Sequence, residues 1–305
     1  RWEMGDGRRM INKKQVEQFD REGYLLCADL LTVDDLRPVI DAYEAHIDRR
    51  AHELHTAGKL SSTYAEEPFA RRLASICQET GVLYPELDIM YMRDRALFDF
   101  LHHPKLLDLA EAFVGPEILC SPIQHVRPKL PSGLTPRGSD PHVVHWHQDA
   151  GVAWEEADPY FILTVWIPLV DATPENGCLR LIGGVHRDGL LPHRTKRGLG
   201  TAIHGDRLAG KSIVTLPMRK GSLLLMHKHT PHSSSRNTTD GVRWSMDLRY
   251  QATGTATGRP FHPAFVARSR RNPASVLTDY DEWCRRWAEA LADDQGQRVH
   301  RWAEQ

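Results

Sequence analysis

The sequence lacks the features that mark several broad classes of protein. Its 39 Lys and Arg against 40 Asp and Glu give a net charge near −1, so nothing favours nucleic acid or an anionic membrane as partner. No apolar run is long enough to span a bilayer, and the start, RWEMGDGRRM, has no signal-peptide core. The five cysteines are scattered, without Cys-x-x-Cys, which indicates reduced thiols rather than disulfides. We therefore expect a cytoplasmic protein, monomeric or homodimeric.

Helical and β-type patterns succeed one another along the chain. Thr32 is a suitable N-cap for a helix whose apolar residues recur at helical spacing, and Trp283 and Trp287 lie on one face of a later helix, as core residues would. Between them, short runs such as FILTVWIPLV and SLLLMH are separated by Gly, Pro, Asn and Asp, which is typical of a β-sandwich or barrel. The stretch PSGLTPRGSDPH reads as a loop. We expect one mainly-β domain over 1–305 with flanking α-helices: a helical N-terminal region (1–118), a β core (119–252) and a C-terminal helical extension (253–305).

Histidine is the one unusually abundant residue, at 17, and it provides the candidate metal ligands. The bare motif His-x-Asp is a weak indicator of a site because it occurs four times, at His46/Asp48, His147/Asp149, His186/Asp188 and His204/Asp206. Inside a helix, residues two apart point to different sides, which argues against His46 and Asp48. On a strand, residues two apart share a face, so His147 and Asp149 can reach one ion together.

A second histidine-rich stretch, GSLLLMHKHTPHSSSRNTTDGVRWSMDLRY, follows downstream. One of its histidines, His227, His229 or His232, would complete a set of two histidines and one carboxylate. That set suits Fe(II) and leaves coordination positions open for a cosubstrate and O2. Arg243 and Ser245, again two apart on an expected strand, can together grip a carboxylate through a guanidinium fork and a hydroxyl.

Together these stretches resemble the phytanoyl-CoA dioxygenase-like (PhyH) family of Fe(II)/2-oxoglutarate-dependent oxygenases. Four blocks follow in the family's order: HQD, TVWIPLVDATPENGCLRLI, LLPH, and His-x-Ser-x-x-Asn with an Arg eleven residues after the His. FDREGYLL and LHHPKLLDLAEAFVG also resemble the family's helical preamble, so the likeness spans roughly residues 15–250. One turn departs from the family's usual Pro-Gly-Ser-His and reads Gly-Gly-Val-His. Of the three downstream histidines, one has partners at the family's spacings: His232, with Ser234, Asn237, Arg243 and Ser245.

The resemblance implies a double-stranded β-helix (jelly roll, cupin-like) and a hydroxylase that uses Fe(II), 2-oxoglutarate and O2. Such an enzyme oxidises an unactivated C–H of a small-molecule metabolite while 2-oxoglutarate becomes succinate and CO2. The catalytic iron ligands by this resemblance are His147, Asp149 and His232. The residues expected at 2-oxoglutarate are Arg243, on its distal carboxylate, with Ser245, Trp166, Lys129 and Gln124. Those expected to face the substrate are Trp154 and His145.

Two other functions fit parts of the pattern. A cupin-type metalloenzyme would use the HWH tripeptide, but it needs a Glu three or four residues after the second His, where Ala150 and Gly151 stand. A non-catalytic jelly-roll metal-binding or regulatory module would tolerate loss of a ligand or of the arginine, and none is lost here. A halogenase would have a small residue in place of Asp149. The sequence therefore favours hydroxylation or a related oxidation and does not identify the substrate.

Overall fold

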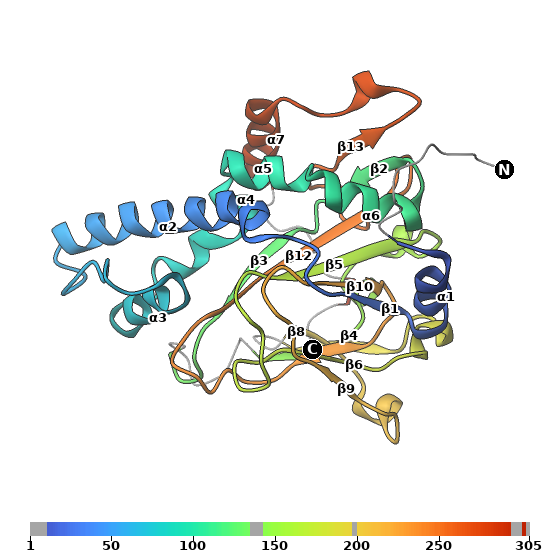
Figure 1. The fold of residues 1–305 in the computed structure, drawn as a ribbon, viewed down its shortest axis with the longest axis horizontal. Coiled ribbons are helices and arrows are strands. Elements are labelled where there is room, and N and C mark those ends of the chain that lie inside the picture. Colours follow the sequence, from blue (N-terminus) through green and yellow to red (C-terminus); the bar gives the residue numbers. More distant parts are fainter. Residues whose placement is uncertain (1–10, 135–142, 197–199, 294–300, 303–305) are drawn as a thin grey trace.

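Two antiparallel β-sheets face each other, and most of the helices pack on the outer face of the larger sheet (Figure 1). The computed structural model describes residues 11–134, 143–196, 200–293 and 301–302. The start of the chain and most of the expected loop at 131–142 lie outside these residues. The arrangement confirms the predicted mainly-β fold with flanking helices and a jelly-roll core.

The strands fall into two sheets and a hairpin, with all neighbours antiparallel. The larger sheet runs β1 (Tyr24–Cys27), β10 (Leu223–His227), β5 (Ile162–Pro168), β12 (Arg243–Ala252), β2 (Glu117–Cys120) and β13 (Phe265–Ser269), and β3 (His125–Lys129) also pairs with β12. The smaller sheet runs β4 (Val144–His147), β11 (His232–Ser234), β6 (Leu179–Leu181) and β9 (Val214–Leu216). The hairpin is β7 (His193–Lys196) and β8 (Gly200–Ile203).

The helices begin and end largely where local sequence signals place them. Thr32 caps α2 as predicted: its side chain accepts from the Asp35 N–H, and the Asp35 carboxylate accepts from the Thr32 N–H. The α-helices are α1 (Lys13–Glu22), α2 (Val33–Thr56), α3 (Phe69–Glu79), α4 (Ile89–Met92), α5 (Arg95–Leu101), α6 (Pro104–Val114) and α7 (Tyr280–Asp293). Short 3-10 helices lie at η1 (Tyr84–Leu87), η2 (Asp149–Gly151), η3 (Glu155–Ala157), η4 (Val185–Asp188), η5 (Gly205–Leu208) and η6 (Pro273–Ser275).

Strand β12 shows how the fold separates an apolar layer from a polar one. Successive side chains of a strand point to opposite faces. One set packs in the main core with the helices: Trp244, Met246, Leu248 and Tyr250. The alternate set faces the smaller sheet: Arg243, Ser245, Asp247 and Arg249. The space between the sheets therefore receives the polar side chains of this strand.

The β structure extends beyond the predicted core at 119–252. β1 lies in the region expected to be helical and forms one edge of the larger sheet, and β13 lies in the expected helical extension and forms the other edge. Each is only four or five residues long and makes its backbone hydrogen bonds to distant segments, so its own sequence carries little signal. Trp283 and Trp287 are each 2% exposed, as predicted for core residues.

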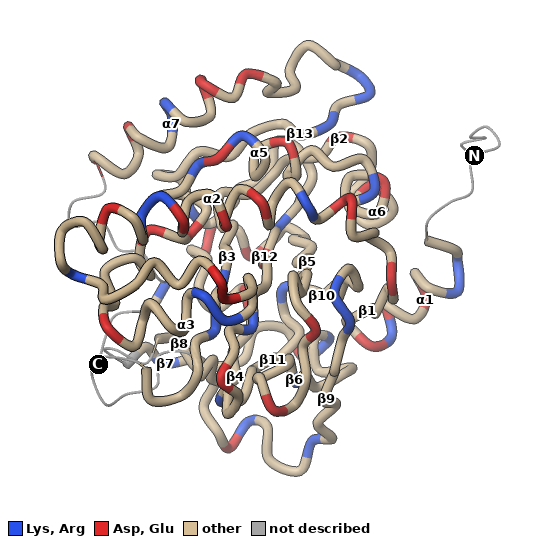
Figure 2. Tube along the Cα trace, turned by 60° about the vertical axis from the view of Figure 1, so that its left-hand side comes forward, with Lys and Arg blue, Asp and Glu red and all other residues tan. Residues whose placement is uncertain are grey.

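The structure also shows how charged side chains and thiols are distributed. Figure 2 shows Lys and Arg interspersed with Asp and Glu along the described chain. None of the helices in that part of the chain is both long and apolar enough to cross a membrane. All five cysteines are free, as predicted.

Candidate metal centre

Two facing strands of the smaller sheet bring the two predicted histidine ligands together. His147 is the last residue of β4, His232 is the first of β11, and the two are partners in the antiparallel ladder. The sequence had suggested that Asp149 lies on the same strand as His147, but Asp149 begins the 3-10 turn η2. The strand ends because the N–H groups of Gln148 and Ala150 donate outside the sheet, to His193 Nε2 and to the Lys228 carbonyl.

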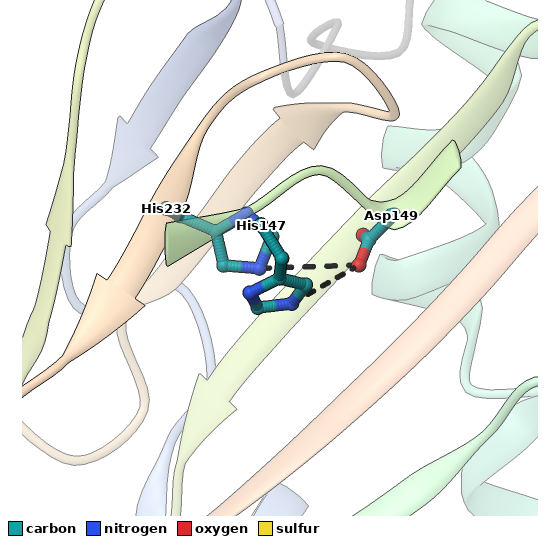
Figure 3. Close-up of side chains that lie close together, drawn as sticks. All are labelled: His147, Asp149 and His232. Atoms are coloured by element: carbon teal, nitrogen blue, oxygen red, sulfur yellow. Dashed lines mark ion pairs between the residues drawn. The ribbon is translucent and has the colours of Figure 1, made fainter. Parts of the chain in front are cut away.

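The three side chains converge on one point (Figure 3). Asp149 Oδ1 lies 3.9 Å from His147 Nε2 and 3.9 Å from His232 Nε2. The ligand atoms of the three residues all lie within 4.8 Å of one another, and no other such group of His, Cys, Asp and Glu occurs among the described residues. We call His147, Asp149 and His232 the inner cluster.

Both imidazoles are oriented for metal binding by their second nitrogen. His147 Nδ1 donates to the His145 carbonyl at 2.9 Å, and His232 Nδ1 donates to the Thr230 carbonyl at 3.0 Å. Each Nε2 then carries the lone pair, which is the form that ligates a metal. Burial lowers the pKa of His147 to about 3, so this ring stays neutral at physiological pH.

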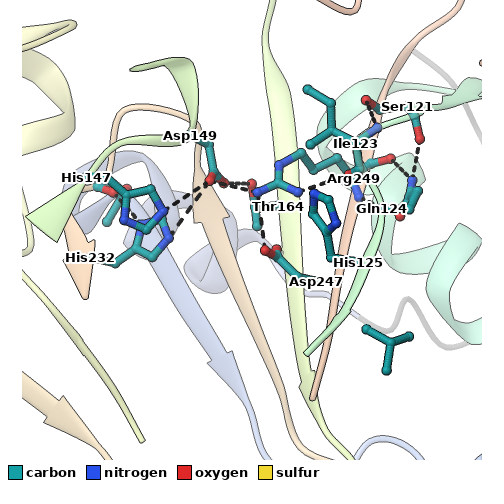
Figure 4. A network of polar contacts seen from close by, with 12 residues as sticks. Ser121, Ile123, Gln124, His125, His147, Asp149, Thr164, His232, Asp247 and Arg249 are labelled. Carbon is teal, nitrogen blue, oxygen red and sulfur yellow. Dashed lines mark hydrogen bonds and ion pairs between the residues drawn. The ribbon is translucent and has the colours of Figure 1, made fainter. Parts of the chain in front are cut away.

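The carboxylate of Asp149 is held at both oxygens (Figure 4). Arg249 Nη2 donates to Oδ1 at 2.8 Å, and the Thr164 hydroxyl donates to Oδ2. Burial raises the pKa of Asp149, but the charge of Arg249 and the contacts with His232 and His147 outweigh it and hold the pKa well below its usual range. Asp149 is therefore ionised, as a ligand must be. Two neutral imidazoles and one carboxylate form a donor set that fits Fe(II) and similar divalent ions.

Gln148 was not predicted to belong to the site, and its side chain holds together the segments that carry the inner cluster. It is fully buried; its amide nitrogen donates to the carbonyls of Gly189 and His229, and its oxygen accepts from the Leu191 N–H. These bonds tie the turn carrying Asp149 to the segment just before His232. Its place between two candidate ligands is the one sequence signal that could have singled it out.

A buried arginine lies on the same inner face of β12. Arg243 is 3% exposed, donates to the Ser245 hydroxyl at 2.7 Å, and stacks over the Trp166 ring at 5.3 Å. Burial lowers the pKa of Arg243 to about 10, which still leaves it charged. No described residue forms an ion pair with it, and its Nε is buried without a hydrogen-bond partner. Ser245 and Trp166 therefore both lie against Arg243, and these are three of the five residues predicted at 2-oxoglutarate.

The remaining predicted site residues are spread around this centre. Lys129 is buried opposite Arg243 in the strand pairing and donates to the Ser235 carbonyl. Gln124 uses its amide group on the protein itself, donating to the Ser121 and Arg249 carbonyls and accepting from the Arg249 N–H. Trp154 is half-buried against the Phe261 ring. His145 is exposed, and its carbonyl is the group that orients His147.

A second group of histidines lies away from the inner cluster. The rings of His186, His227 and His229, the outer cluster, pack together at tilted angles, with neighbouring ring centroids 5.3 and 5.1 Å apart. His186 and His227 line a cavity of about 340 Å³ with residues of α1 and α6, on the helix-covered side of the larger sheet. His227 and His229 are thus separated from the ligand position that His232 occupies.

The fold and the site together define the class of protein: a jelly roll with a two-histidine, one-carboxylate centre between its sheets. The sequence model of the phytanoyl-CoA dioxygenase family matches residues 19–245. The chain belongs to that family, whose members are non-haem iron, 2-oxoglutarate-dependent enzymes.

Known relatives agree with this assignment. The peroxisomal phytanoyl-CoA dioxygenase of Homo sapiens is 27% identical over 79% of this chain and 68% of its own length. The 1-deoxypentalenic acid 11-beta-hydroxylase of Streptomyces arenae is 28% identical over 57% of this chain and 64% of its own.

Solved structures share the fold at lower identity. The non-heme monooxygenase ThoJ superposes with a TM-score of 0.57 at 21% identity, covering 90% of this chain and 96% of its own. The epimerase SnoN, in complex with Fe3+, alpha ketoglutarate and nogalamycin RO, gives 0.52 at 21% identity, covering 82% and 88%.

Proposed function

We propose that the protein is an Fe(II)/2-oxoglutarate-dependent dioxygenase that hydroxylates an unactivated C–H of a small-molecule metabolite. His147, Asp149 and His232 would hold the iron, and Arg243 with Ser245 would bind the distal carboxylate of 2-oxoglutarate. Iron bound there, with 2-oxoglutarate and O2, supplies the oxidising power, and succinate and CO2 are the coproducts. The names of the relatives and the arrangement of these residues both support the proposal.

The observation that carries the proposal is the buried cation of Arg243. Burying a guanidinium without a counter-charge is costly, so such a group is normally paired. Arg243 lacks a described carboxylate partner and has Ser245 as a second hydrogen-bond donor at its side. A dicarboxylate that chelates iron with one end and meets Arg243 with the other would satisfy it. A bare metal-binding jelly roll has no need of this cation.

The protein itself contributes to catalysis by holding the ligand side chains in place and by excluding water. The imidazoles and the carboxylate are each fixed by a second contact before any metal binds. Trp166 covers one side of Arg243 and is 4% exposed, so a carboxylate bound to Arg243 would be largely shielded from water. His145 and Trp154 are the residues we assign to the substrate side.

The test is anaerobic titration of the Fe(II) protein with 2-oxoglutarate, followed by the metal-to-ligand charge-transfer band. Losing one partner of a buried ion pair costs about 3–5 kcal/mol. Arg243→Ala is therefore expected to weaken 2-oxoglutarate binding by about a hundredfold or more, with iron affinity little changed. Arg72→Ala is the matched control, since Arg72 is a buried arginine paired with Asp48 in the helical layer. A wild-type protein with no such band, and no succinate in air, would refute the oxygenase assignment.

Product analysis separates hydroxylation from other oxidations of the same class. SnoN is named an epimerase, although it carries Fe3+ and alpha ketoglutarate in its complex. A screen of small metabolites with Fe(II) and 2-oxoglutarate should reveal a product heavier by one oxygen atom. A product of unchanged mass, or one lighter by two hydrogens, would be consistent with the enzyme class and would rule out hydroxylation as the reaction.

A further inference from the structure

The guanidinium of Arg249 occupies a position that no sequence motif assigns. It donates to Asp149 Oδ1, the same oxygen that lies 3.9 Å from both histidine Nε2 atoms. A carboxylate oxygen has two lone pairs, so one can accept from Arg249 while the other remains for a metal. Asp247 also pairs with the guanidinium, at 3.4 Å, so two carboxylates share one cation (Figure 4).

Arg249 is held firmly in this position. Its side chain is 5% exposed, and Nη1 donates to the Ile123 carbonyl at 3.0 Å. The Gln124 amide brackets the backbone of Arg249, accepting from its N–H and donating to its carbonyl. Strand β12 is itself paired on both sides, with β5 and with β2 and β3. These contacts fix the guanidinium beside Asp149.

We propose that Arg249 is the internal counterion of the inner cluster, which stabilises the metal-free protein and weakens the site's hold on a divalent cation. This inference rests on the metal site of the proposed function. In the metal-free protein Arg249 neutralises the buried carboxylate of Asp149, whose other close neighbours are the Thr164 hydroxyl and the two imidazole rings. In the metal-bound protein the same guanidinium lies beside a dication and repels it.

Opposite effects on the two states follow from this arrangement. Replacing Arg249 by Met leaves Asp149 and Asp247 without their shared cation, which destabilises the metal-free fold. A divalent ion then replaces the missing positive charge, so its binding becomes tighter. A residue that merely orients Asp149 would give the reverse result, since loss of an outer-shell partner typically weakens metal binding about 10–100-fold.

The experiment compares Mn(II) binding and thermal unfolding of the whole chain 1–305 and its variants. We expect Arg249→Met to lower the Tm in EDTA by about 5–10 °C and to tighten Mn(II) binding by at least about tenfold. Arg249→Lys, which keeps the charge, should stay within about threefold of wild type in Mn(II) affinity. Arg72→Met, which breaks the buried pair with Asp48, should lower the Tm and leave Mn(II) affinity unchanged.

Asp247→Asn tests the same idea from the opposite side and keeps the shape of the side chain. Removing one anion leaves Arg249 fully available to Asp149, so Mn(II) should bind about fivefold more weakly. Weaker or unchanged Mn(II) binding in Arg249→Met would overturn the counterion role. Should that variant not fold, unchanged or tighter binding in Asp247→Asn would overturn it equally. A wild-type protein that binds no Mn(II) or Fe(II) would instead refute the metal site itself, and with it the proposed function.

Discussion

The inner and outer histidine clusters contain similar rings and differ in what surrounds them. In the inner cluster, His147 and His232 stand 4.2 Å apart by ring centroid, with their Nε2 atoms directed at the Asp149 carboxylate. In the outer cluster, His227 Nδ1 accepts from the His229 N–H, and the ring packs against Phe161 at 5.2 Å. One arrangement directs lone pairs at a common point, and the other uses imidazoles as aromatic packing.

The presence of a carboxylate decides between these two roles. Asp149 offers a charged candidate ligand, which imidazoles alone do not supply. The outer cluster forms no ligand group with Asp or Glu within the described part of the chain. Burial lowers the pKa of His227 to about 3 and of His229 to about 4, so both rings remain neutral. The number of nearby histidines is therefore a poor guide to a metal site, and the convergence of ligand atoms is a good one.

The largest expected contrast between the clusters is in metal binding. His232→Ala removes one of three candidate ligands and should weaken Fe(II) or Mn(II) binding by more than about a hundredfold, beyond the loss caused by an outer-shell change. The variants His229→Ala and His227→Ala should keep most of the metal affinity, because neither ring reaches Asp149. Atomic absorption on the three purified variants measures this. Iron lost from His229→Ala and kept by His232→Ala would reverse the assignment.

A second contrast concerns stability, through the glycine beside the outer cluster. Gly23 ends α1 with φ +77°, and an added Cβ would lie 2.4 Å from His186 Nδ1 and 2.8 Å from Thr230 Oγ1. Gly23→Ala should lower the free energy of unfolding by about 2 kcal/mol, through strain and overpacking together.

Gly58→Ala isolates the backbone contribution to that loss. Gly58 has φ +68° and nothing within 4 Å of an added Cβ, so only about 1 kcal/mol is expected there. Urea unfolding of both variants gives the comparison, and Mn(II) should still bind to each. Equal losses at the two positions would show that the outer cluster is not tightly packed.

The smallest effect is a pH dependence that comes from the outer cluster. His227 titrates near 6.5 when unfolded and at about 3 when folded, so below pH 6.5 the unfolded chain binds the extra proton. Stability from this group is present above that pH and is lost as the pH falls toward 3. His227→Gln should reduce the fall in Tm between pH 6.5 and 5.5 by about 2 °C. An unchanged slope, measured on metal-free protein in EDTA, would mean that the ring protonates freely in the folded state.

Much of the fold follows from local patterns in the sequence. The Thr32 cap, the apolar spacing of α2 and the buried tryptophans of α7 all follow from side chains within a few turns of one another. The alternation along β12 likewise predicts that Arg243 and Ser245 share a face, and they are hydrogen-bonded. The choice of His232 also came from local spacing to Arg243, combined with the resemblance to a family.

The sequence by itself thus predicted a mainly-β fold, the candidate ligands and a candidate cation for a cosubstrate, from periodicity and short spacings together with the resemblance to a family. Tertiary structure alone decided that β1 and β13 complete the larger sheet and that Asp149 lies on a turn. It also decided that Arg249 pairs with an aspartate 100 residues away in the chain. These outcomes depend on which distant backbone and side-chain groups satisfy one another once water is excluded, and no local pattern encodes a partner at that separation.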